Sequence, residues 1–162
     1  MTILFQMKNL LFILLAVTVI FSACEKEEEE ITTSSSAAVF SCKIDGSNLS
    51  NATINTSTTS GNLSITATAN SYSVTITIQA INSRNNGDEI PFSSPNFGNV
   101  SIGSTTYSNT YFSPEKGEIS ISNLDLSGGK ISGAFFFEAQ DVTLNEFGIV
   151  NVTEGSFSNI SF

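Results

Sequence analysis

Cys24 is the residue of this sequence whose type and position most clearly allow chemistry. It follows an apolar run, stands directly after the small residues Ser22 and Ala23, and precedes an acidic stretch at 25–30. Small residues between an apolar segment and a polar one are typical of a leader-cleavage site. The arrangement therefore predicts that a leader is removed before Cys24 and that a lipid is attached to this cysteine.

Cys42 is the second cysteine, and its position predicts a structural role. Within residues 40–44 it alternates in step with Phe40 and Ile44, so its side chain is expected to point into the core of a strand-built domain. A catalytic thiolate needs a nearby base, usually a histidine, and the sequence contains no histidine. We expect Cys42 to be buried and unpaired, because a lipidated Cys24 forms no disulfide.

The carboxylates are the other residues that could support catalysis. A hydrolase of the glycosidase type needs two of them facing one cleft at a defined separation. The sequence places Asp45 in a turn, alternates Glu138 to an outer face and puts Asp141 after a strand, so we nominate no catalytic pair. We therefore predict a protein that is not an enzyme. The alternative is a small envelope hydrolase whose acids would come from Asp45, Asp88, Glu89, Glu115, Glu118, Asp125, Glu138, Asp141 and Glu146.

Composition argues against metal, cofactor and nucleic-acid binding. Zinc prefers cysteine and histidine ligands, and a calcium site built from Asn85, Asn86, Asp88 and Glu89 would lack the regular spacing of an EF-hand. No helix is expected after Gly128-Gly129, so this turn offers no phosphate cradle. The formal charge is −9 and the basic residues are scattered singly, whereas phosphate binding needs clustered bases. We expect no metal, no cofactor and no nucleic acid.

One hypothesis of ligand binding rests on aromatic residues. Tyr107, Tyr111 and Phe112 lie near a loop rich in proline and glycine, as aromatic contacts do in glycan-binding modules. The alternative is that they are strand and core residues, which these residue types favour, and the absence of tryptophan supports that alternative. Residues 82–99 contain turn residues and two prolines, which predicts a long loop or a pair of turns. This loop is the candidate surface for an envelope protein or an extracellular ligand.

Residues 1–23 are predicted to form a signal peptide with a helical apolar core. Lys8 supplies a positive start, and residues 10–20 are almost continuously apolar. A transmembrane helix is the competing interpretation, but about 14 apolar residues are short against the roughly 20 that cross a bilayer. Either Met1 or Met7 could start the chain.

Two regions follow the leader. Residues 24–38 predict the lipidated cysteine and a disordered tether, because repulsion within the glutamate run and a serine-rich tract both oppose collapse. Residues 39–162 predict one all-β domain, because apolar and polar residues alternate with period two, most clearly from Tyr72 to Ala80. Turn signals roughly every 8–12 residues, with Asn70-Ser71 as a tight hairpin, indicate about eight or nine short strands in an antiparallel sandwich or a small meander barrel.

The sequence Phe-Ser-Ala-Cys at 21–24 resembles a lipobox, the signal at which bacterial lipoproteins are cleaved and acylated, with Phe21 in place of the commoner leucine. The resemblance implies an N-terminal lipid on Cys24, and its three acyl chains exceed the two signals that stable anchoring requires. Lys26, Glu27 and Glu28 resemble the signal that exports Bacteroidota lipoproteins to the outer face of the outer membrane. The alternative is a solvated acidic linker on a periplasm-facing protein.

The β domain resembles a family as well. Residues 40–46 are similar to an opening F-x-A-x-I-D-G, residues 117–121 and 129–137 to G-x-I-x-I and G-x-I-S-G-x-F-x-F, and residues 155–157 to a closing G-S-F. These elements are those of a Bacteroidota lipoprotein domain family of unknown function, although Leu49 stands where the family often has an aromatic residue. The resemblance implies a β domain on a lipid anchor, with no established activity.

Overall fold

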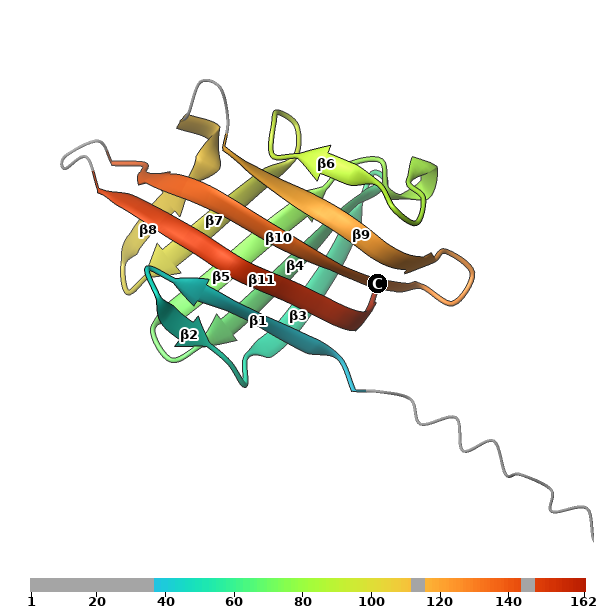
Figure 1. The fold of residues 1–162 in the computed structure, drawn as a ribbon, viewed down its shortest axis with the longest axis horizontal. Helices are drawn as coiled ribbons and strands as arrows, with labels where there is room; N and C mark the ends of the chain where they lie inside the picture. The colour runs from blue at the N-terminus through green and yellow to red at the C-terminus, as the bar shows by residue number, and fades with distance from the viewer. Residues whose placement is uncertain (1–36, 112–115, 144–147) are drawn as a thin grey trace, which may run out of the picture. The chain divides into compact units, whose positions relative to one another are not determined.

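The computed structural model describes residues 37–111, 116–143 and 148–162, which form an antiparallel β structure (Figure 1). This part of the chain contains eleven strands and two short 3₁₀ helices. In chain order they are β1 (Val39–Ile44), β2 (Ser47–Leu49), β3 (Thr53–Thr59), β4 (Asn62–Ala69), β5 (Tyr72–Ile78), η1 (Ile81–Ser83), β6 (Glu89–Pro91), β7 (Phe97–Ile102), β8 (Thr105–Ser108), η2 (Asn109–Tyr111), β9 (Gly117–Asp125), β10 (Lys130–Asp141) and β11 (Ile149–Ser161).

The strands form one curled sheet in which the pairings are antiparallel. Its order is β2-β1-β11-β10-β8-β7-β5-β4-β3, with β9 on β10 and β6 on β9. The 12-residue strand β10 joins the two sides, because its first part up to Phe137 pairs with β9 and its last residues, Gln140 and Asp141, pair with β8. Figure 1 shows β1, β9, β10 and β11 lying over β3, β4, β5 and β7. The predicted all-β antiparallel fold is confirmed.

One hydrogen bond shows how far the sheet curls. The Thr56 hydroxyl in β3 donates to the backbone carbonyl of Ser161 in β11 at 2.8 Å. These two strands are far apart in the order of the sheet, so its two sides must face each other. A single curled sheet therefore encloses the core, where the sequence predicted either a sandwich or a small barrel.

The core follows the predicted alternation. Leu63 and Ile65 of β4 and Val74, Ile76 and Ile78 of β5 are fully buried, while the serines and threonines between them lie on the opposite face, where Thr77 is also buried. Burying one such aliphatic side chain contributes roughly 1.5–3 kcal/mol. Aromatic rings fill the space between the two sides, with neighbouring ring centroids 5.1–6.3 Å apart, and come from Phe40, Phe92, Phe135, Phe137 and Phe157.

The predicted turns use backbone conformations that suit their residues. Asp45 and Gly46, which join β1 to β2, both have positive φ, and so does Asn70 in the turn between β4 and β5. Asparagine, aspartate and glycine tolerate this left-handed region better than other residues. Ser122 is skipped in the pairing of β9 with β10, which is the bulge expected where the alternation of that strand changes parity.

The structure contains more strands than the eight or nine expected. β2, β6 and β8 have only three or four residues each, so a period-two pattern cannot stand out in them. Of the two alternatives for the segment 82–99, a long loop or a pair of turns, the structure contradicts the continuous loop. The segment includes the end of η1, the whole of β6 and the first residues of β7.

Candidate functional site

The residues predicted to carry the lipid and the export signal lie outside the described ranges. They are Cys24, Lys26, Glu27 and Glu28, and their roles stay predictions. Within the ranges that the structure does describe, no helix has the length and apolar character needed to span a membrane.

Five of the seven candidate carboxylates in the described ranges serve turns or an ion pair, whereas Glu89 and Glu118, on the paired strands β6 and β9, show no such contact. Glu138 and Glu154 each bind a lysine side chain, at 2.6 and 2.7 Å. Asp45 accepts a hydrogen bond from a backbone N–H of β11 at 2.8 Å, and Asp141 accepts two bonds of 2.7 Å from Thr143. Among the described residues, no group of three or more histidines, cysteines and acids could hold a metal ion. None of these contacts joins two carboxylates. Glu115 and Glu146 lie outside the described ranges.

Asp125, in the turn between β9 and β10, illustrates this structural use of a carboxylate. Its Oδ1 accepts hydrogen bonds from the backbone N–H of Gly128 at 2.8 Å and from the hydroxyl and N–H of Ser127 at 2.8 and 3.1 Å. These bonds, the one from Gly128 above all, lower the pKa of Asp125 below its ordinary value. The negative charge therefore stabilises the turn.

Two buried asparagines, which the sequence did not single out, brace the segment 82–99. Asn109 is fully buried: its Oδ1 accepts the N–H of Gly98 at 2.8 Å, and its Nδ2 donates to the carbonyl of Phe92 at 3.1 Å. Asn96 is also buried, and its Oδ1 accepts the N–H of Gln79 at 2.9 Å. The segment is therefore a fixed part of the fold, so it is a weaker candidate for an adaptable binding loop.

The residues of the calcium and aromatic hypotheses have structural contacts of their own. Asn86 accepts a hydrogen bond from the N–H of Leu124, and Asp88 accepts one from the N–H of Asn85 at 3.1 Å. Tyr107 is partly buried and packs against the core. The structure describes neither Phe112 nor the Tyr111 side chain. Of the three residues of the aromatic hypothesis, only Tyr107 can therefore be assessed, and it packs against the core instead of forming an open binding surface.

A hollow of about 470 Å³ lies where two segments distant in sequence meet at strand ends. Residues 48–53 form one wall, between β2 and β3, and residues 68–72 form the other, around the turn from β4 to β5. Ligand sites in proteins commonly have volumes of roughly 300–1,000 Å³. Six of the lining residues are polar and uncharged, namely Asn48, Ser50, Asn51, Thr53, Thr68 and Asn70.

The backbone holds two of the three amides at the rim of this hollow in place. Asn51 and Asn70 have φ values of 55° and 54°, which put both in the left-handed region. Leu49, 3% exposed, anchors the first wall in the core, and Tyr72 is partly buried and packs against the core beneath the second. The rim residues are therefore displayed from fixed strand ends.

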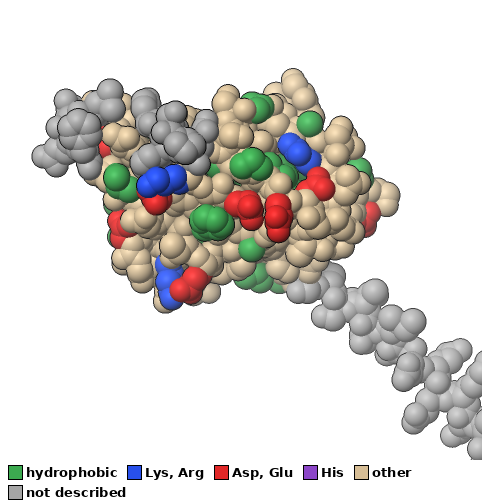
Figure 2. All heavy atoms as spheres, turned by 45° about the horizontal axis from the view of Figure 1, so that its top comes forward, with side chains coloured by type: hydrophobic (Ala, Val, Ile, Leu, Met, Phe, Trp, Pro, Cys, Tyr) green, Lys and Arg blue, Asp and Glu red, His purple; other side chains and the backbone are tan. Residues whose placement is uncertain are grey.

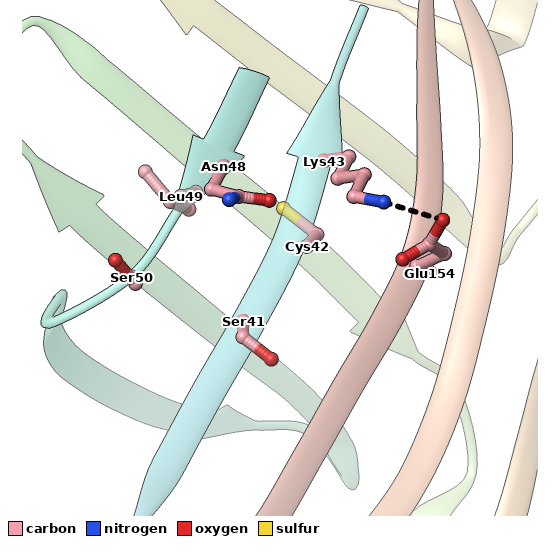
Figure 3. A pocket seen from close by; sticks show the side chains of 7 residues that line it. All are labelled: Ser41, Cys42, Lys43, Asn48, Leu49, Ser50 and Glu154. Atoms are coloured by element: carbon pink, nitrogen blue, oxygen red, sulfur yellow. Dashed lines mark hydrogen bonds and ion pairs between the residues drawn. The ribbon is translucent and has the colours of Figure 1, made fainter. Parts of the chain in front are cut away.

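A smaller hollow shares a wall with this one, and Figure 3 shows its seven lining residues. Its volume is about 160 Å³, and one of its lining residues is Cys42, with 4% of its surface exposed. Burial raises the pKa of the Cys42 thiol to about 12, so the thiol is neutral at ordinary pH and is a poor nucleophile. Lys43 and Glu154 also line this hollow and are joined by an ion pair of 2.7 Å. The expected core role of Cys42 is confirmed.

The outer face of the sheet beside the larger hollow carries rows of uncharged side chains. Residues at paired positions on neighbouring strands share a face, so the pairings of β3, β4, β5, β7 and β8 define such rows. The row that starts at the hollow consists of Thr53, Thr68, Ser73, Ser101 and Thr106. Two hydroxyl pairs within it are hydrogen-bonded, at 3.2 and 3.4 Å. The larger hollow therefore continues into an uncharged polar surface.

Charged side chains are sparse on the part of the surface that Figure 2 shows. On the face shown in Figure 2, acidic and basic side chains lie singly or in small groups, and most of the surface is neither charged nor hydrophobic. Another hollow, of about 420 Å³, is lined in part by Arg84 and Asp125. The hollow between residues 48–53 and 68–72, which we call the amide hollow, combines a lack of charge with a mainly polar lining, whereas a smaller uncharged hollow beside Phe40, of about 140 Å³, is mostly apolar.

The fold and the amide hollow define an all-β domain with one curled antiparallel sheet and an uncharged polar cavity at its strand ends. The chain belongs to the family described as a domain of unknown function, DUF6252, whose sequence model matches residues 36–161. No curated protein and no solved structure matches the chain. The expected membership in a family of unknown function is confirmed, while the bacterial group and the lipoprotein character stay predictions.

Proposed function

We propose that this protein is a lipid-anchored β domain of the bacterial cell envelope that acts by binding a ligand or a partner. The apolar leader, the small residues before Cys24 and the acidic stretch after it support acylation of that cysteine. In this proposal the protein sits in the outer membrane, and Lys26, Glu27 and Glu28 direct it to the outer face. Anchoring leaves the domain beyond residue 38 free to meet extracellular or envelope molecules.

The observation that carries the binding role is the amide hollow. It has the volume of a small-molecule site, its rim amides lie on ordered strand ends, and its lining holds no carboxylate or base that could serve as catalyst. A hydrolase with a carboxylate pair would need two acids converging on such a cavity. Five of the seven candidate acids in the described ranges are used for turns or an ion pair, and none of the seven lines this cavity, which favours binding over catalysis.

Replacement of the cysteine tests the anchor. We expect Cys24→Ala to abolish acylation and cleavage, so metabolic labelling with a palmitate analogue should be lost and an unprocessed precursor should accumulate. Ser22→Ala is the matched control, because it keeps a small residue before the cysteine, and it should be labelled and processed like the wild type. Continued lipid labelling of Cys24→Ala would refute the anchor.

Exposure at the cell surface has a separate test. Replacing Lys26, Glu27 and Glu28 together with alanine should leave the protein lipidated but protected from protease added to intact cells. Replacing Glu29 and Glu30 with alanine removes similar charge from the same stretch and should leave the protein accessible. Equal accessibility of both variants would show that residues 26–28 are only a linker.

A further inference from the structure

We propose that the amide hollow binds a neutral carbohydrate, an inference that rests on the proposed binding function and names its ligand class. The hollow is formed by two strand-end segments, 48–53 and 68–72, and its volume of about 470 Å³ accommodates a short stretch of a saccharide. The chemistry of its lining selects the ligand.

The lining excludes a charged ligand. After residue 30 the chain has ten acidic and four basic residues, yet none of them lines the amide hollow. A charged ligand would lose hydration there without gaining an opposite charge, which is unfavourable. The hollow beside Arg84 and Asp125 is of similar size but is charged, and the uncharged hollow beside Phe40 is smaller and mostly apolar.

The lining also excludes a mainly apolar ligand and suits a polyhydroxylated one. Its apolar part is limited to Leu49, Ala69 and Tyr72, whereas six polar residues surround them. Each asparagine amide offers two donors and one acceptor oxygen, and each hydroxyl can both donate and accept. Sugar hydroxyls have the same dual character, and the C–H face of a sugar ring can rest on a tyrosine ring.

The side-chain amides at the rim of the hollow are available for hydrogen bonds to a ligand. Among the described residues, no hydrogen bond joins the side chains of Asn48, Asn51 or Asn70 to another protein group. A ligand therefore replaces water at these amides without breaking protein hydrogen bonds. The left-handed backbone conformation of Asn51 and Asn70 restricts the positions that their side-chain amides can reach, which lowers the entropic cost of binding.

The hydroxyl row on the outer face offers a continuation for a longer saccharide. Thr53 and Thr68 belong both to the hollow and to the row, which crosses neighbouring strands in steps of roughly 4.8 Å. A hexasaccharide should therefore bind more tightly than a disaccharide of the same sugar.

Glycine substitutions at the rim provide a sharp test. Asn51→Gly and Asn70→Gly each remove an amide but keep a residue that adopts positive φ without strain, so the fold should be retained. Loss of one or two hydrogen bonds should weaken saccharide binding by about fivefold to tenfold in each variant. Ser60→Gly is the matched control: Ser60 also has positive φ, at 53°, but lies in the turn at the other end of β3 and β4. It should bind as the wild type does.

The measurement uses the full-length protein purified in detergent micelles. Maltohexaose, cellohexaose, N-acetylchitohexaose and mannohexaose are screened by saturation-transfer-difference NMR, and the affinity of any binder is measured by calorimetry. Saturable binding of a neutral hexasaccharide that weakens in both asparagine variants and persists in Ser60→Gly supports the proposal.

Three results would overturn the carbohydrate site. They are no binding of any panel member at millimolar concentration, binding that both asparagine variants leave unchanged, and binding of a neutral Ser/Gly peptide in place of every saccharide. Lipid labelling of the same variants separates this proposal from the anchor, because it depends on Cys24 and not on the rim. Protein that carries the lipid label but binds no saccharide would refute the carbohydrate ligand and leave the lipid anchor unaffected.

Discussion

The substitution Asn109→Ala provides a quantitative test of the fold around the amide-braced segment 82–99. The Asn109 side chain is fully buried and bonds the N–H of Gly98 at 2.8 Å and the carbonyl of Phe92 at 3.1 Å. Alanine makes neither bond and leaves two backbone groups unpaired. Each unpaired buried group costs about 1–3 kcal/mol, so the free energy of unfolding should fall by about 2–6 kcal/mol. Equilibrium urea unfolding followed by circular dichroism measures this loss.

Two further variants make this prediction refutable. Asn55→Ala removes an exposed amide from β3 and should change the free energy of unfolding by less than about 0.5 kcal/mol. Asn109→Asp keeps the acceptor for Gly98 but places an oxygen against the Phe92 carbonyl. Burial raises the pKa of such a carboxyl, so its protonated form can donate to Phe92 at low pH and the variant should lose stability as pH rises. A loss below about 1 kcal/mol in Asn109→Ala would refute the reasoning.

Two other predictions concern the core. Burial raises the pKa of the Cys42 thiol from 9.0 to about 12, so its contribution to stability is complete below about pH 9 and is lost as pH rises towards 12. Urea unfolding at several pH values should therefore show a steeper alkaline loss in wild type than in Cys42→Ala, and parallel curves would contradict this. Gly98→Ala would place a Cβ 2.8 Å from the Phe137 ring and should cost about 1–3 kcal/mol. Gly148→Ala, whose Cβ would lie 3.5 Å from its nearest neighbour, should be nearly neutral in the same assay, and equal losses would contradict the packing argument.

The alternation in the sequence was sufficient to predict the central strands and their buried faces. In β4 and β5 each apolar residue alternates with a serine or threonine, and a one-residue shift would have moved every apolar side chain into water. Cys42 could be assigned to the core for the same reason, since it shares parity with Phe40 and Ile44. The alternation of apolar and polar residues therefore predicts the buried face of a strand wherever the strand is long enough to repeat the pattern.

The amide hollow could not be predicted in this way. Its walls come from the connection after β2 and the turn after β4, and only the curl and register of the sheet bring these segments together. Neither segment shows a regular alternation of apolar and polar residues, and their asparagines are of a type that is common in turns. The contacts of Asn109 were equally inaccessible, because its partners lie 11 and 17 residues away in sequence.

The contrast between these asparagines shows how burial separates structural from functional amides in this domain. Asn96 and Asn109 are buried, and their side chains satisfy backbone groups, so their removal should change stability. Asn51 and Asn70 are exposed and make no such bond among the described residues, so their amides contribute little to the fold. Selection for stability alone gives no reason to gather free amides around an uncharged hollow. A ligand that bonds to them provides that reason, and it is why stability and saccharide binding should respond to different asparagines.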